Sequence, residues 1–432
     1  MPDSSASDIV PSARALLKQR DYLFFWGARW FGAFAAQIES VALGWQMYGL
    51  ARRTMDVQQS AFMVGMIGLA AFLPVLLLTL PAGETADRHD RRKVALACLA
   101  GEMASALLLT VAAWRGFATP ALLLVVATLF GAFRAFFSPA NTAMGPMLVP
   151  RQLLPRSIAW NSLAWQTAAI AGPAAGGLLV AISPAHAFVA AVVFYAVAAF
   201  CVTMIGANTR PVRQSGSRWA SMKEGLAYVW REKFVLGAIS LDLFAVLLGG
   251  ATALLPIFAK DVLHTGPWGL GLLRAAPAVG ALLMSLWLAR HNLERRVGTL
   301  MFASVAGFGV ATLVFAVSTW LWVSLVALFA LGAFDMVSMV IRGALVQLDT
   351  PDDMRGRVSA VNAIFINTSN QLGEFESGLL AAWLGAVNAT LIGGIGTLVV
   401  VGLWMWMFPT LRQRQKLHAE PNELSEPAAD TL

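Results

Sequence analysis

The chain has 432 residues, of which 58% are hydrophobic and only 13% are charged. Soluble domains carry about 25% charged residues, so the composition excludes an ordinary soluble domain and indicates a protein that lies mostly in lipid. The net charge of +7 does not indicate a nucleic-acid partner, because the positive residues lie in short stretches between apolar runs.

The chain begins with a polar segment, residues 1–21, which has no apolar core before a cleavage site and is not a signal peptide. Twelve apolar runs follow, and each can cross the bilayer as a helix of about 20 residues. The polar tail, residues 409–432, is expected to be cytoplasmic and disordered. The predicted spans are 22–49, 60–82, 94–114, 119–142, 158–181, 185–207, 234–258, 268–289, 298–318, 320–346, 358–384 and 387–408.

A linker, residues 208–233, divides the spans into two six-helix domains, 22–207 and 234–408. Within it, residues 217–233 place apolar side chains on one helix face and basic residues around the rest. This pattern predicts either a cytoplasmic helix at the membrane surface or a helix that packs on the protein without lipid contact.

The two domains repeat each other at an offset of 201 residues. Gly131-Ala132-Phe133 recurs as Gly332-Ala333-Phe334, and Gly177-Leu178-Leu179 recurs as Gly378-Leu379-Leu380. The sequence therefore predicts an all-α polytopic membrane protein with two pseudo-symmetric halves. In such proteins the substrate binds between the halves, and rocking of one half against the other alternates access to it.

The distribution of Lys and Arg predicts the orientation in the membrane. The N-terminal segment, the even-numbered loops and the tail hold 23 of the 31 Lys and Arg residues. This bias places both termini in the cytoplasm. It also favours the count of twelve spans, because one helix more or fewer would disturb the alternation.

The loop between the second and third spans contains Gly83, Asp87, Arg88, Arg91 and Arg92. Gly83 permits close helix approach, and Asp87 can interact with a neighbouring helix N-terminus or a basic side chain. The basic cluster alone would be typical of any cytoplasmic loop, where it can bind anionic headgroups. The spacing from Gly83 to Asp87 favours a conformational latch on the cytoplasmic side.

The fifth span contains Gly172, Pro173, Gly176 and Gly177. Small residues let this helix press against a neighbour, and Pro173 bends it. Gly and Pro are also common in membrane helices without a special role. At the matching place in the second half Pro173 is replaced by Glu374, so the repeat exchanges a packing residue for a charge.

Charged residues inside the apolar runs are the main functional candidates, because each is costly in lipid and usually faces a cavity or a partner. The alternative for each acid is a structural ion pair or a side chain that reaches the membrane surface. A carboxylate in a low-dielectric cavity can hold a proton at neutral pH and release it beside an arginine, as a proton-driven antiporter requires. The candidates for coupling or substrate binding are Arg29, Glu39, Arg134, Asp242, Asp335 and Glu374.

Two pairs of opposite charge occupy matching places in the halves. Arg134 matches Asp335 under the offset of 201 residues, and a looser alignment matches Arg29 with Asp242. We expect salt bridges across the halves that break and re-form during the cycle. Arg342 lies close enough to the cytoplasmic end of its span to reach the surface.

No phosphate-binding loop and no cluster of metal ligands stands out, so no cofactor or metal is expected and the proton gradient is the expected energy source. No nucleophile–base pair stands out either, which argues against an enzyme.

These motifs resemble those of the major facilitator superfamily, and the resemblance covers about residues 22–408. The loop motif is similar to the superfamily's loop signature, apart from Asp90 at a position where the superfamily usually has Gly. The Gly-Pro motif is similar to that of its exporters, and Arg134 matches an arginine that is often linked to proton transfer. The branch containing the bacterial enterobactin exporter and the transmembrane secretion effectors is similar at residues 87–93, 172–177, 356–362 and 371–378.

The resemblance implies proton-driven export of a siderophore or another amphipathic small molecule, such as a drug, by a monomer in a bacterial inner membrane. A proton-coupled importer and a lysophospholipid flippase of the same fold are the alternatives. A membrane scaffold that transports nothing belongs to a different class, and the buried charges in both halves argue against it.

Overall fold

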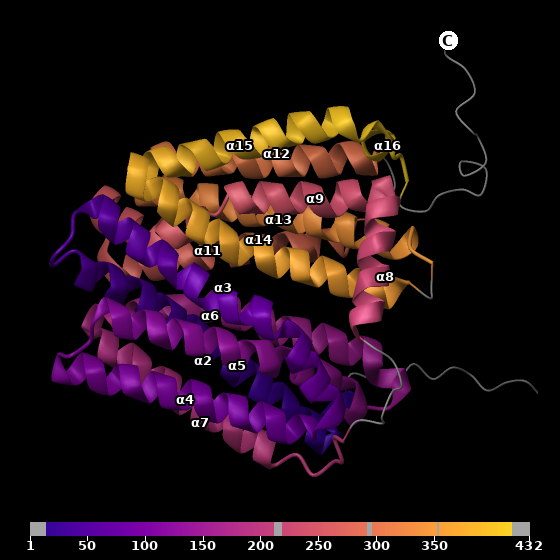
Figure 1. The fold of residues 1–432 in the computed structure, drawn as a ribbon, viewed down its shortest axis with the longest axis horizontal. Helices are drawn as coiled ribbons and strands as arrows, with labels where there is room; N and C mark the ends of the chain where they lie inside the picture. The colour runs from indigo at the N-terminus through magenta and orange to yellow at the C-terminus, as the bar shows by residue number, and fades with distance from the viewer. Residues whose placement is uncertain (1–13, 211–217, 292–295, 352–353, 417–432) are drawn as a thin grey trace, which may run out of the picture.

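We describe a computed structural model of the chain over residues 14–210, 218–291, 296–351 and 354–416, and every regular element in these ranges is helical. The long helices lie roughly side by side in two groups, and one shorter helix crosses one end of both groups (Figure 1). Most of the N-terminal segment and the tail beyond residue 416 lie outside the described residues.

The N-terminal half begins with a single turn, α1 (Arg14–Leu17), and continues with six long helices. Side chains cap several of them, since Asp56, Asp90, Thr119 and Ser183 each accept a hydrogen bond from an amide of the following turn. The long helices are α2 (Arg20–Ala51), α3 (Val57–Arg88), α4 (Arg91–Arg115), α5 (Pro120–Met144), α6 (Leu154–Ile182) and α7 (Pro184–Thr203), with the 3₁₀ turns η1 (Gly145–Leu148) and η2 (Arg151–Leu153) between α5 and α6.

The linker helix α8 (Arg218–Arg231) crosses from one half to the other at what we call the linker end of the bundle (Figure 1). The C-terminal half then contains α9 (Lys233–Leu248), η3 (Ala251–Leu254), α10 (Leu255–Ile257), the π-helical turn η4 (Phe258–Val262), α11 (Gly266–Leu288), α12 (Val297–Val317), α13 (Leu321–Leu348), α14 (Arg355–Leu384), α15 (Ala386–Met407) and α16 (Pro409–Gln413).

Ten helical stretches among the described residues are long and apolar enough to cross a membrane. The helices α2 and α14 are not among them. Both are long, 32 and 30 residues, and both carry charges, but they pack between the halves and contact several other long helices. The prediction of twelve spans therefore depends on counting these two helices as spans that are shielded from lipid by their neighbours.

The prediction of one continuous helix over 234–258 is wrong, because α9 ends at Leu248 and the chain continues through η3, α10 and η4. The interruption falls at Gly249-Gly250. A Cβ atom on Gly250 would lie 2.6 Å from the carbonyl carbon of Gly373 in α14. Two residues without side chains thus let the backbone of this span bend closely against α14.

The linker helix packs on the protein, as one of the two alternatives predicted. Val229 is buried against α9 and α14, and the Glu224 carboxylate lies 3.1 Å from the Arg357 guanidinium. Trp230, however, is 64% exposed. The same helix therefore contacts the protein with one face and presents an aromatic side chain on another, as a helix at a membrane surface would.

Glycine contacts reproduce the sequence repeat in three dimensions. A Cβ atom on Gly131 in α5 would collide with the backbone of Ala71 in α3, and one on the matching Gly332 in α13 would collide with the backbone of Pro277 in α11. Equivalent helix pairs of the two halves therefore touch through the same close backbone approach.

We predict that Gly131→Ala and Gly332→Ala each lower the stability of the protein by about 1–3 kcal/mol, because the added methyl group forces the paired helices apart. Thermal unfolding in detergent measures the change. Gly402→Ala, at a position with open space around it, is the matched control and should leave the unfolding temperature unchanged. Equal effects of all three substitutions would contradict the proposed role of the close contacts.

Candidate functional site

The two halves meet along two seams that both lie away from the linker end. In one seam α3 packs on α14, where a Cβ atom on Gly65 would lie 2.7 Å from the Cα atom of Gly378. In the other seam α6 packs on α11, where a Cβ atom on Gly177 would lie 2.7 Å from the Cα atom of Gly271. Gly177 and Gly378 are repeat partners, so the seams are related by the same pseudo-symmetry. We call the end where they lie the opposite end.

The predicted packing motif of α6 makes one of these seams. Gly172 faces the Gln37 side chain of α2, and Gly176 faces the backbone of Ile38 in the same helix. Gly177 and the Pro173 carbonyl instead approach Gly271 of α11, in the other half. The motif therefore joins α6 to its own half on one side and to the other half on the next.

A polar clasp closes the opposite end between α2 and η4. The Tyr48 hydroxyl of α2 donates a hydrogen bond to the Asp261 carboxylate of η4. The neighbouring Lys260 ammonium lies 5.8 Å from the ring centre of Trp45 and 5.6 Å from that of Tyr48, within the range of a cation–π interaction. The wider π-helical turn lets two consecutive residues of η4 reach the same neighbouring helix.

Charges also lie directly at the contact between the halves. The Arg274 guanidinium of α11 donates a hydrogen bond of 2.9 Å to the Ser40 hydroxyl of α2 and is attracted by the Glu374 carboxylate. Glu374 lies against Gly68 of α3, where its carboxylate would be 3.2 Å from an added Cβ atom. The predicted candidate Glu374 is therefore part of the seam between α3 and α14.

Inside the N-terminal half, two acids surround one arginine. The Tyr195 hydroxyl of α7 donates a hydrogen bond of 2.9 Å to Glu39 of α2, and Arg134 of α5 lies 3.1 Å from Glu102 of α4. Glu39 is 3% exposed and Glu102 is 1% exposed. One guanidinium cannot neutralise two buried carboxylates, so this cluster of four residues has room for one proton.

The C-terminal half repeats this stoichiometry with other residues. Asp242 of α9 forms a buried salt bridge with Arg342 of α13, and Asp335, two turns before Arg342 on the same helix, interacts electrostatically with both. Again two carboxylates accompany one guanidinium. Arg342 is only 4% exposed, so the prediction that it reaches the membrane surface is wrong, because Asp242 provides a partner inside the protein.

The predicted salt bridges across the halves are not formed in this structure. Arg134 pairs with Glu102 and Asp242 pairs with Arg342, each within its own half. Residues that match under the repeat face the interior of their respective halves, so sequence equivalence does not bring them together. Tyr195 was not foreseen as a site residue, since a tyrosine in an apolar run carries no charge to mark it.

Arg29 is the one predicted candidate that faces the space between the halves. Along α2 it shares a helix face with Ser40 and Gly44, both of which contact the C-terminal half. It is half-buried, and among the described residues it forms no hydrogen bond or salt bridge. Arg29 lies three turns closer to the linker end than Ser40, on the side where the halves are not sealed.

Polar side chains continue this surface on the helices that border it. Asn367 and Asn370 in the middle of α14 and Ser162 of α6 are exposed. An exposed amide facing hydrocarbon is costly, so these side chains indicate water between the halves. The structure therefore describes a state closed at the opposite end and accessible from the linker end.

The latch motif lies at the linker end, but most of it is helical and does not form a loop. Arg91 donates a hydrogen bond of 2.9 Å to the Ala143 carbonyl, and Arg92 donates one of 2.5 Å to the Thr203 carbonyl. Arg88 pairs with Glu84 one turn earlier in α3, the helix that also contains Gly83 and Asp87. In this state the contacts of the three arginines all lie within the N-terminal half.

Asp90, which replaces the usual glycine of the motif, has a structural explanation. Its carboxylate caps α4 at the Arg92 amide and accepts a hydrogen bond of 2.5 Å from the Thr209 hydroxyl. Burial raises the pKa of Asp90, but these hydrogen bonds outweigh it, so the pKa lies below its usual value. The residue thereby ties the start of α4 to the beginning of the linker.

Within the part of the chain that the structure describes, no group of three or more His, Cys, Asp or Glu residues is placed to hold a metal ion.

Comparison with known proteins places these features in a family. The family model of transmembrane secretion effectors matches residues 11–431. The multidrug efflux pump Tap of Mycobacterium tuberculosis is 27% identical over 370 residues, which cover 82% of this chain and 87% of Tap. Macrolide efflux protein A of Streptococcus pyogenes is 24% identical over 359 residues, which cover 79% of this chain and 85% of that protein.

Solved structures share the fold. A bacterial homologue of the human lysosomal transporter Spinster, in an inward-facing and occupied conformation, superposes with a TM-score of 0.71 at 10% identity. The match covers 93% of this chain and 98% of that one. The predicted major facilitator fold is confirmed by this similarity.

We predict that Tyr48→Phe and Asp261→Asn favour opening of the opposite end, because each removes the hydrogen bond that closes the clasp. Electron spin resonance distances between labels at Thr54 and Trp268, both exposed and in different halves, should show a larger population of long distances. Tyr22→Phe removes a hydroxyl of the same type inside the N-terminal half and should leave the distances unchanged. Unchanged distances in both clasp variants would contradict a gating role.

Proposed function

Because the chain belongs to the transmembrane secretion effectors of the major facilitator superfamily, we propose that it exports amphipathic, drug-like small molecules in exchange for protons. Family and fold indicate a transporter and not an enzyme. The relatives named for multidrug and macrolide efflux support export of drug-like compounds. A siderophore, which is also amphipathic, is the second candidate substrate, from the motif resemblance alone.

The buried cluster of the N-terminal half carries the proposal of proton coupling. Glu39 and Glu102 share the single guanidinium of Arg134 in a site that is almost free of solvent contact. A proton on one acid leaves a neutral pair of charges, whereas its loss leaves a net negative charge that burial disfavours. The protonation state therefore changes the energy of any conformation that alters access of water to this cluster.

Alternating access follows from the two seams and the unsealed linker end. With both termini and the linker in the cytoplasm of a bacterial cell, the described state is open to the inside. Substrate then enters beside Arg29 and the polar face of α14. Proton uptake from the outside and substrate release require the clasp and the seams to open. A ligand shifts this equilibrium only by its different affinities for the two states.

We predict that Glu39→Gln reduces drug efflux driven by a pH gradient by about tenfold or more, because the substituted amide can neither take up nor release a proton. Accumulation of a fluorescent drug in cells that express the variant measures the loss. Glu84→Gln, an exposed acid of α3, is the matched control. Folding is checked by gel filtration and thermal unfolding, which should match the unmodified protein. Normal gradient-driven efflux by Glu39→Gln would exclude this residue as the coupling group.

The substrate class is tested separately in a strain that lacks the transporter. We predict increased retention of macrolides or dyes inside such cells, with secretion of siderophore under iron limitation unchanged, because the named relatives export drugs. Mass spectrometry of cells and medium measures both. Siderophore accumulation inside the cells, together with its loss from the medium, would instead identify the siderophore as the substrate.

A further inference from the structure

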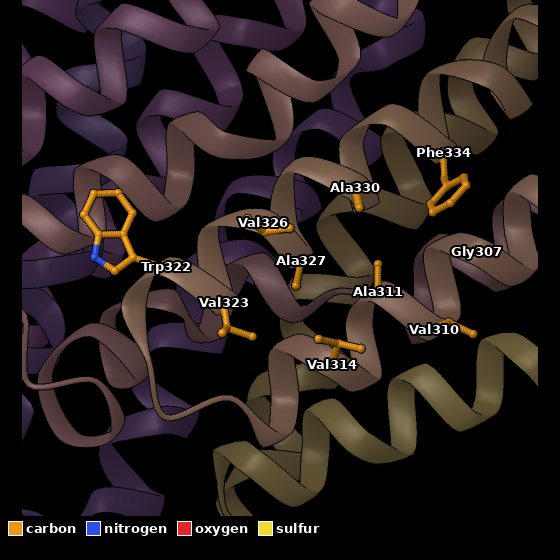
Figure 2. A pocket seen from close by; sticks show the side chains of 10 residues that line it. All are labelled: Gly307, Val310, Ala311, Val314, Trp322, Val323, Val326, Ala327, Ala330 and Phe334. Carbon is orange, nitrogen blue, oxygen red and sulfur yellow. The ribbon is translucent and has the colours of Figure 1, made fainter.

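A groove of about 590 Å³ runs between α12 and α13 on the outside of the C-terminal half (Figure 2). Small residues form what we call its floor, namely Gly307, Ala311, Ala327 and Ala330. Larger ones form its rim, namely Val310, Val314, Trp322, Val323, Val326 and Phe334. No charged, hydroxyl or amide side chain lines it.

The surroundings of the groove are those of a lipid-facing surface. Trp322 is 74% exposed and Val326 is 67% exposed, and both α12 and α13 are apolar enough to span a membrane. Neither helix takes part in the seams between the halves. A substrate that passes between the halves therefore does not meet this groove.

The dimensions of the groove match one leaflet of a bilayer. Along α13 it extends from Trp322, at the start of the helix, to Phe334, which corresponds to about 18 Å at the rise of an α-helix. Half of the hydrocarbon core of a bilayer is about 15 Å thick. Trp322 thus lies where headgroups meet hydrocarbon, a position that tryptophan favours, and Phe334 lies near the membrane centre.

The internal repeat shows that the groove is specific to one half. Gly101 and Phe133 make the same ring-over-glycine contact in the N-terminal half as Gly307 and Phe334 do in the C-terminal half, which fixes the correspondence between the helix pairs. The positions that match Ala327 and Ala330 of the floor hold Val126 and Leu129, and the position that matches Trp322 of the rim holds Ala121.

The exchange of small for large residues therefore reverses between floor and rim. In the N-terminal half the chain fills the floor with its own side chains and has a low rim. In the C-terminal half the floor is low and the rim is high. Simple lipid exposure would not produce this difference, since both surfaces face the same solvent.

We propose that the groove is a binding site for one acyl chain of a membrane phospholipid from the leaflet at the opposite end of the bundle. An acyl chain is apolar throughout, has no hydrogen-bonding groups to satisfy, and fills a leaflet-deep hollow that a lipid interior would otherwise leave with poor packing. Its headgroup lies beside Trp322, at the helix end. The proposal depends on the membrane location alone and not on the proposed substrate or coupling ion.

The test replaces the floor with the residues that the other half already uses. Ala327→Val combined with Ala330→Leu fills the groove with side chains that this fold accommodates at the matching positions. Ala196→Val combined with Ala199→Leu on α7 makes the same change, at the same spacing, on another helix surface. Full-length proteins are purified from membranes of phosphatidylethanolamine and phosphatidylglycerol, washed in increasing detergent, and analysed by native mass spectrometry.

We expect the unmodified protein and the α7 control to retain one phospholipid per chain at detergent concentrations where the filled-groove variant retains none. Phospholipid and free fatty acid differ in mass, so an adduct of fatty-acid mass would overturn the assignment to phospholipid. Equal retention by the filled-groove variant, or no retained lipid in the unmodified protein, would overturn the site itself. Ala330→Leu alone, with a smaller change in volume, provides the same comparison if the double variant does not fold.

Discussion

A charge inside a membrane protein is stable only beside an opposite charge, a proton or water, and this constraint organises the centre of the molecule. Each half encloses two carboxylates and one guanidinium, so in each half one acid lacks a cationic partner. Arg29, the remaining candidate, instead faces the space between the halves. Burial thus separates the charges into two kinds, those that hold protons within a half and those that a substrate can reach.

The second constraint is the absence of a hydrophobic driving force between helices in lipid, which leaves close backbone packing to hold them together. Glycines satisfy it both within the halves, at Gly131 and Gly332, and between them, at Gly65, Gly177 and their partners. Contacts between the halves are nearly free of large side chains at the seams, and the polar clasp adds directional bonds at one end only. A rocking motion therefore has few interdigitated side chains to disrupt.

The sequence predicted the architecture well because membrane helices announce themselves by length and apolarity, and because the repeat aligns without gaps. It located the buried charges for the same reason. It did not predict their partners, since the pairing of Glu102 with Arg134 or of Tyr195 with Glu39 depends on which faces of distant helices meet. The interruption at Gly249-Gly250 and the π-helical turn that presents Lys260 and Asp261 depend on tertiary contacts with α14 and α2 that no local pattern encodes.

The central claim, exchange of protons for substrate, is tested most directly with the purified protein in liposomes that contain a pH-sensitive dye. The protein is given a transported macrolide or dye on one side, and proton movement and substrate movement are recorded together. Coupled exchange predicts that substrate moving in one direction drives protons in the other, and that an imposed pH gradient accelerates substrate movement. Substrate transport without proton movement, and at a rate independent of the gradient, would contradict the account.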